Sequence, residues 1–154
     1  MLILAIFVIA GIVMVITNKD EGTIEPSDEL INKTPGYSTM IKVSELVSAQ
    51  QLEKSLLNIE VLPTGETEDI VLEIQGNDFV NEETLLKDSY NIFAGAVDIQ
   101  ELNTFTIVWY AKLTPDNPEV LRITMTKDTI AQLKQNSYLI LPELAELYEK
   151  HSTL

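Results

Sequence analysis

The apolar segment at the start of the chain limits its folds more than any other feature. Residues 2–17 (LILAIFVIAGIVMVIT) contain no charged side chain. As a helix this run would extend roughly 24 Å, slightly less than the ~30 Å hydrocarbon layer of a bilayer. We therefore expect a single-pass transmembrane anchor at residues 1–17, which contacts the lipid bilayer through residues 2–17.

Two alternative interpretations of this run stay open. A cleavable secretory signal has similar length, but it needs a basic segment before the apolar run and a small-x-small cleavage site after it. Here the run is followed by Asn18, Lys19 and Asp20. A buried element of a soluble fold is the other alternative, although charges so close to a long terminal apolar run are unusual for a core.

The orientation of the anchor depends on few charges. Lys19 alone would place the following part in the cytoplasm, because lysine and arginine near a span favour the inner side. Acidic residues follow Lys19, however, and long domains cross the membrane largely regardless of charge. We expect a protein of the bacterial cell membrane whose soluble domain lies outside the cytoplasm.

Composition restricts the partners of the rest of the chain. The formal net charge is -14, from 24 acidic and 10 basic residues, and there is no cysteine. Such a charge disfavours nucleic acid and anionic membrane surfaces as partners. The absence of cysteine excludes disulfides and thiolate metal sites. We expect an acidic tether at residues 18–36 and one soluble domain at residues 37–154.

Hydrophobic periodicity in the first half of this domain predicts a helix and then a hairpin. Residues 40–54 favour a helix with Ser44 as its N-cap. The alternation of apolar residues at 57–61 and again at 70–74, on either side of a turn at 63–66, predicts a β-hairpin. The apolar side of the helix would be formed by Val43, Leu46, Val47, Ala49 and Leu52.

The second half repeats this order. Asn81 predicts the cap of a helix over 81–97, and strands are expected at 104–114 and 120–126. Residues 127–136 and 142–150 predict two further helices. The fold class is α+β: an N-terminal transmembrane helix, followed by one compact domain of antiparallel hairpins packed on helices in the order helix-hairpin-helix-hairpin-helices.

We find no motif that indicates a reaction or a ligand. The chain has no GxSxG, HExxH or GxxxxGK[ST] pattern, and its one histidine, His151, is expected at the surface near the end. Acidic clusters are interpreted as solvated turns and helix starts, with the group at Asp78 as the strongest exception for a hard cation such as Ca²⁺. We expect no catalytic residue, cofactor or bound metal. These clusters are Glu66, Glu68 and Asp69; Asp78, Glu82 and Glu83; and Asp116 and Glu119.

The strand at 104–114 suggests an interaction face. Trp109 and Tyr110 are neighbours, so they point to opposite sides of a strand. Assigning Trp109 to the core leaves Tyr110, Lys112 and Arg122 on the other face, which could bind a peptide or a partner domain. The alternative is that a further helix covers this face.

These observations favour a membrane-anchored domain that binds another protein, as an accessory or assembly component of a bacterial cell-envelope system. The alternative is an anchored enzyme or small-ligand sensor, which would require a deep pocket with convergent polar side chains. The oligomeric state is left open.

Overall fold

The described part of the chain begins after the predicted anchor. The computed structural model describes residues 34–77, 81–112, 118–152 and 154. The predicted anchor at 1–17, and nearly all of the predicted tether at 18–36, lie outside these residues. No helix among the described residues is long and apolar enough to cross a membrane. Gly36–Leu154 forms one unit by itself.

The first helix starts earlier than predicted. Helix α3 (Tyr37–Ala49) follows Gly36, whose φ of 78° is easily adopted by glycine. The carbonyl of Gly36 accepts the first helical hydrogen bond from the Met40 N–H at 2.9 Å. Ser44 therefore lies inside the helix, and the prediction of Ser44 as the N-cap is wrong.

The first predicted hairpin is confirmed. Strands β1 (Leu56–Thr64) and β2 (Thr67–Gln75) pair in antiparallel fashion. Ile59 and Val61 are buried, as their alternation predicts, whereas Leu57 is 43% exposed. The register of the two strands shifts at this point, and such an irregularity redirects a side chain.

The central helix and the second hairpin are also confirmed. Helix α4 (Glu82–Ala96) is capped by Asn81, as predicted, and it buries one apolar side that includes Leu85, Leu86, Ile92 and Phe93. Strands β3 (Leu102–Tyr110) and β4 (Glu119–Thr126) are antiparallel. Trp109 is 1% exposed, so its assignment to the core is correct.

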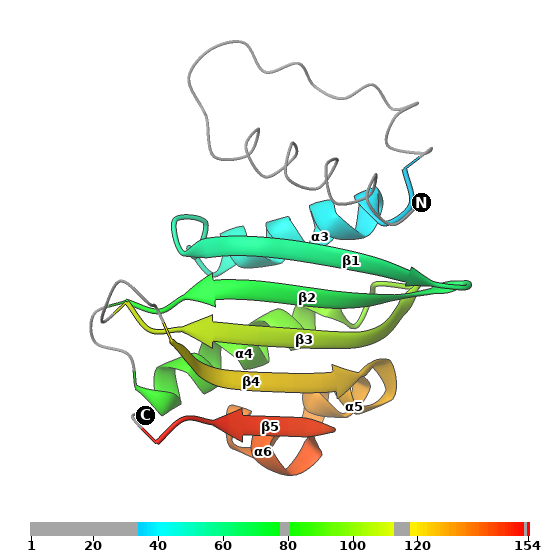
Figure 1. The fold of residues 1–154 in the computed structure, drawn as a ribbon. Coiled ribbons are helices and arrows are strands. Elements are labelled where there is room, and N and C mark those ends of the chain that lie inside the picture. Colours follow the sequence, from blue (N-terminus) through cyan, green and yellow to red (C-terminus); the bar gives the residue numbers. More distant parts are fainter. Residues whose placement is uncertain (1–33, 78–80, 113–117, 153) are drawn as a thin grey trace, which may run out of the picture. The chain divides into compact units, whose positions relative to one another are not determined.

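The two hairpins join in one sheet of order β1-β2-β3-β4-β5 (Figure 1). Strands β2 and β3 run parallel, because α4 returns the chain to the same end of the sheet before β3 begins. The sequence predicted the antiparallel pairs but not this parallel one. The described residues thus form an α+β domain.

The C-terminal region differs from the prediction of two helices. Residues 127–136 form α5 (Lys127–Gln132) and a short 3-10 turn, η1 (Leu133–Gln135). Residues 142–150 were expected to be helical, but the chain leaves the helical conformation at Ala145 and forms strand β5. The unpaired edge of β4 offers backbone partners to this segment, and sheet pairing overrides its helical pattern. The remaining elements are η2 (Tyr138–Ile140), α6 (Leu141–Leu144) and β5 (Leu147–Lys150).

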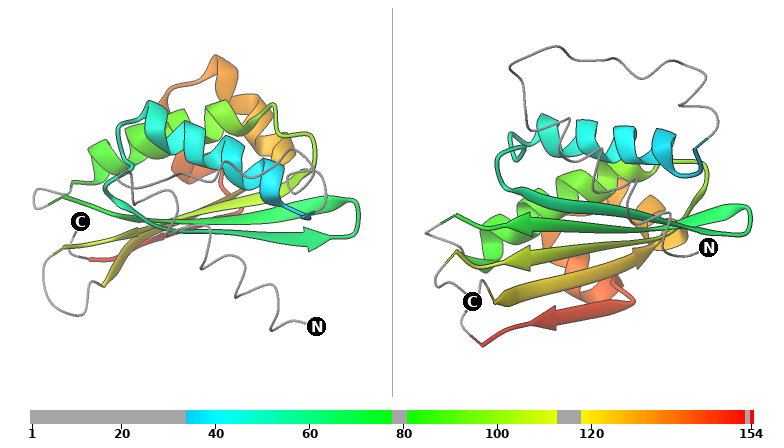
Figure 2. Two further views of the ribbon diagram at one scale, coloured as in Figure 1. Left: turned by 90° about the horizontal axis from the view of Figure 1, so that it is seen from above. Right: turned by 45° about the horizontal axis from the view of Figure 1, so that its top comes forward.

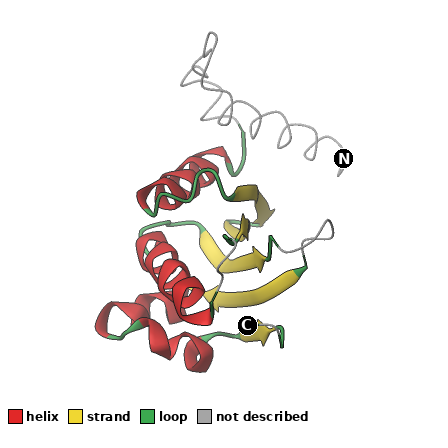
Figure 3. Cartoon of the chain, turned by 90° about the vertical axis from the view of Figure 1, so that its left-hand side faces the viewer, coloured by secondary structure: helices red, strands yellow, loops and turns green. Residues whose placement is uncertain are grey.

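The helices lie on one side of the sheet (Figure 2). The end-on view of Figure 3 shows the same two layers, with the helices on one side and the strands on the other. The core fills the space between them; the Phe93 ring from α4 meets Phe105 of β3 edge-on at a centroid distance of 5.4 Å. The opposite side of the sheet has no helix over it among the described residues.

Candidate functional site

We call this uncovered side of the sheet the bare face. Because side chains alternate along a strand, the residues between the buried core positions point to it. The bare face is formed by Asn58, Glu60, Leu62, Asp69, Val71, Glu73, Gln75, Thr104, Thr106, Val108, Tyr110, Glu119, Arg122, Thr124, Thr126, Leu147 and Glu149.

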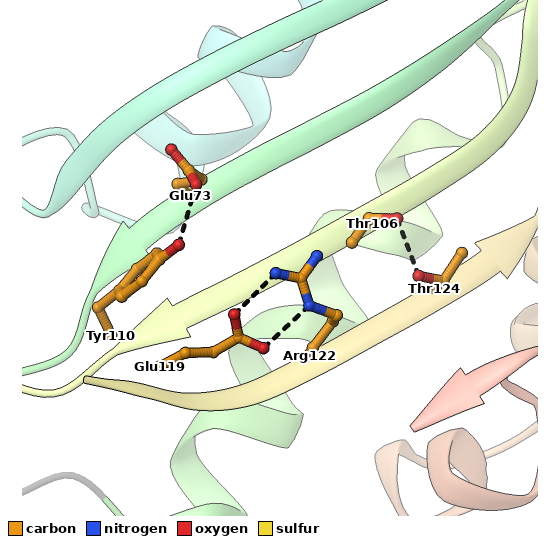
Figure 4. A network of polar contacts seen from close by, with 6 residues as sticks. All are labelled: Glu73, Thr106, Tyr110, Glu119, Arg122 and Thr124. Atoms are coloured by element: carbon orange, nitrogen blue, oxygen red, sulfur yellow. Dashed lines mark hydrogen bonds and ion pairs between the residues drawn. The ribbon is translucent and has the colours of Figure 1, made fainter. Parts of the chain in front are cut away.

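Polar contacts between and within strands hold the centre of the bare face in place (Figure 4). The Tyr110 hydroxyl on β3 donates to Glu73 Oε1 on β2 at 3.0 Å. Arg122 donates from Nε and Nη2 to the two carboxylate oxygens of Glu119, at 2.9 and 2.7 Å. These contacts fix long side chains before any ligand is present.

A threonine pair adds to this arrangement. The hydroxyls of Thr106 and Thr124 are 2.8 Å apart, and the two residues are register partners on β3 and β4. Cross-strand threonine pairs of this kind stabilise a sheet and fix its register.

Val108 shows how closely the polar side chains cover the bare face. Its position in β3 directs it to this side, yet its exposed fraction is 0%. Its register partners are Glu73 on one side and Arg122 on the other. We infer that the stems of these long side chains lie across the valine, as such side chains commonly do on apolar surface.

Tyr110 and Arg122 keep their ordinary charge states near neutral pH. Burial, followed by the hydrogen bond to Glu73, raises the pKa of the Tyr110 hydroxyl above its ordinary value. The hydrogen bonds to Glu119 raise the pKa of the Arg122 guanidinium. Tyr110 therefore remains a neutral donor, and Arg122 remains charged.

The bare face carries more negative than positive charge. Among the described residues of this face, Arg122 is the one cation, and Glu119 binds it. The other carboxylates are those of Glu60, Asp69, Glu73 and Glu149. Asp69 is used within the sheet, because its Oδ1 accepts from the backbone N–H and the hydroxyl of Thr104.

Exposed leucines lie at the two edges of the bare face. Leu62 on β1 is 45% exposed, and Leu147 on β5 is 39% exposed. In register they adjoin Asp69 and Thr124, both of which belong to this face. The polar centre is thus bounded by apolar side chains.

Two of the three predicted interaction residues lie on the bare face, and the third does not. Tyr110 and Arg122 lie on the bare face and take part in its polar contacts. Lys112 is exposed but follows the end of β3, outside the sheet. Sequence reasoning missed Glu73, because its closeness to Tyr110 depends on the register of β2 against β3. It named Glu119 only as a turn acid, because strict alternation would put two residues three apart on opposite faces; the register of β3 and β4 shifts beside Glu119, where it meets Arg122 within β4.

The acidic cluster at Glu82 and Glu83 has a structural role. Glu82 accepts from the Tyr148 hydroxyl at 2.7 Å and from Lys150 Nζ at 2.8 Å, which ties β5 to the start of α4. Asp78 and Asp116, named with the acidic clusters, lie outside the described residues. Residues 34–77, 81–112, 118–152 and 154 contain no group of three metal-ligating side chains.

A shallow open depression of about 400 Å³ lies beside this cluster, on the side of the helices. The hydrogen bond from Lys87 lowers the pKa of Glu83, and Tyr138 donates to the same carboxylate oxygen at 3.0 Å. The carboxylates that line the depression are therefore already paired within the chain. It is lined by Glu82, Glu83, Leu86, Tyr138, Leu139 and Pro142.

Comparison of the chain with known proteins identifies no related protein. No family model matches the chain, and no significant match is found among curated proteins or solved structures.

Proposed function

We propose that this chain is a single-pass protein of the bacterial cell membrane whose domain, outside the cytoplasm, binds another protein through the bare face. In this role it serves as an accessory or assembly component of the cell envelope. The observation that supports this proposal is an uncovered sheet face whose long polar side chains are already held in place by Tyr110–Glu73 and Arg122–Glu119 contacts.

Pre-ordering of a surface favours binding. Side chains that are fixed before association lose less conformational freedom when a partner arrives. Tyrosine and arginine are also the residues that contribute most often to the energy of protein interfaces. Tyr110 and Arg122 are both half-buried on this face, so each offers a surface to a partner.

The size of the surface favours a protein over a small ligand. Adjacent strands are about 4.8 Å apart, so a face of five strands extends roughly 19 Å across. A small-molecule site is usually a concave pocket that encloses its ligand. A broad face with its polar groups spread over several strands suits a protein surface better.

The membrane part of the proposal rests on the sequence. The uncharged run at 2–17 supports the anchor, and the acidic segment at 18–36 supports a tether that gives the domain reach. Protease treatment of intact cells and of protoplasts tests the location. Digestion of the domain from outside supports it, and full protection would contradict it.

Site-specific photocrosslinking in native membranes tests the binding face. The photoreactive residue p-benzoylphenylalanine is placed at Leu62 or Leu147, on the bare face, or at Leu139 in the helical layer as a matched control. Leu139 is 64% exposed and is equally a leucine. We expect one protein adduct from Leu62 and Leu147 and none from Leu139. Adducts only from Leu139, or none at all, would contradict the proposal.

A further inference from the structure

The carboxylates of the bare face extend across the whole sheet. Glu60 lies on β1, Glu73 on β2 and Glu149 on β5. Glu60 and Glu149 are therefore four strand spacings apart, roughly 19 Å. Arg122 cannot balance all of them, because Glu119 engages both its Nε and its Nη2, and its remaining attraction reaches only Glu149, its register partner on β5.

A protein that covers this face must satisfy these carboxylates. Association removes water from the surface, and a carboxylate that is buried without a partner strongly opposes binding. Tyr110 supplies Glu73 with one hydrogen bond but with no positive charge. The cations must therefore come from the partner.

We propose that the partner presents a basic surface, whose lysine or arginine side chains pair with Glu60, Glu73 and Glu149. This inference rests on the proposed function and specifies the chemistry of the protein that the bare face binds. The partner's basic groups are spread over a surface as wide as the sheet. Apolar side chains flank them, where they meet Leu62 and Leu147 at the edges of the face.

Charge disfavours the other occupants. A second copy packed face to face would place carboxylates against carboxylates, which is repulsive. Nucleic acid and anionic lipid are repelled by the same groups and by the net charge of -14. A basic protein gains from the charge that excludes these alternatives.

Charge reversal in the full chain tests the proposal. The protein crosslinked at Leu62 is identified and purified, and its affinity is measured for the wild type and for the double variant Glu60→Lys/Glu149→Lys. The control is Glu45→Lys/Glu143→Lys, which changes net charge equally at exposed positions of α3 and α6. We expect the first variant to bind at least tenfold more weakly and the control to bind within twofold of the wild type.

Further measurements keep the result interpretable. The double variant Glu60→Gln/Glu149→Gln introduces no repulsion toward Arg122, so it should fold even if Glu60→Lys/Glu149→Lys does not. We expect it to bind the partner about threefold or more weakly than the wild type. Raising the salt concentration should slow association of the wild type. Equal affinity of all variants overturns the inference while leaving the proposed function intact. A homodimer or lipid adduct at Leu62, or no adduct, overturns both.

Discussion

The buried contact between Trp109 and Ser89 gives the sharpest test of the core. The indole N–H of Trp109 donates to Ser89 Oγ at 2.9 Å, and both residues are at most 1% exposed. The substitution Ser89→Ala removes the acceptor and leaves the N–H buried without a partner. No water reaches an indole at this depth without opening the packing between α4 and β3.

The free energy of unfolding should fall by a predictable amount. Leaving a buried donor unsatisfied costs about 1–3 kcal/mol. Alanine is a better helix former than serine by about 0.5 kcal/mol, which offsets part of this cost. We therefore expect a net loss of about 1–2 kcal/mol. With an m value near 1.5 kcal/mol/M, the urea midpoint should fall by about 1 M.

Urea unfolding followed by fluorescence measures this loss, because Trp109 is the one tryptophan of the chain. Ser48→Ala, an exposed serine-to-alanine change in α3, is the control and should alter stability by less than about 0.5 kcal/mol. A second control repeats Ser89→Ala in a Trp109→Phe background, with both backgrounds followed by circular dichroism. There the substitution should cost nothing, because no donor is present. An equal cost in both backgrounds would refute the role of the hydrogen bond.

Two further predictions concern the backbone and pH. Gly36→Ala should destabilise the domain more than Gly65→Ala. Both glycines have positive φ, so alanine is strained at either position. An added Cβ at Gly36 would also lie 2.9 Å from Val61 Cγ1, whereas no atom lies within 4 Å of an added Cβ at Gly65. Thermal unfolding of the two variants compares them, and equal losses of about 1–2 kcal/mol would show that backbone strain alone acts. Hydrogen bonds from Lys150 and Tyr148 lower the pKa of Glu82, so its carboxylate stabilises the fold at neutral pH. Glu82→Gln should therefore lower the free energy of unfolding by about 0.5 kcal/mol above pH 4.5, and the stabilities of variant and wild type should converge as the pH falls. Parallel curves of urea midpoint against pH for variant and wild type would contradict this assignment.

Local patterns predicted the elements that local contacts stabilise. Asn81 caps α4 as its position suggested, since the cap bond spans only three residues. The alternation around Trp109 identified its buried side, because pleating follows directly from strand geometry. The parallel pairing of β2 with β3 was not predicted, because it depends on how α4 packs between two hairpins far apart in sequence.

The C-terminal prediction failed for a related reason. Residues 147–150 have a helical pattern, but strand β5 gains backbone hydrogen bonds from β4 and a side-chain bond from Tyr148 to Glu82. These partners lie far away along the chain, so no window of sequence contains them. The same limit applies to the bare face: Tyr110 and Arg122 were identified by alternation, whereas Glu73 required the register of β2 against β3.

The burial of Val108 separates folding from binding on the bare face. An uncovered sheet with apolar side chains would need a partner to be stable in water. Here Val108 is already inaccessible, with Glu73 and Arg122 beside it in register, so the face needs no cover to fold. Glu60 and Glu149 lie farther out on β1 and β5, and none of the contacts that hold the centre involves them. Glutamine substitutions at these outer residues should therefore alter binding while the stability of the domain is retained, because they place no positive charge beside Arg122, the register partner of Glu149. This separation allows binding to be tested apart from folding.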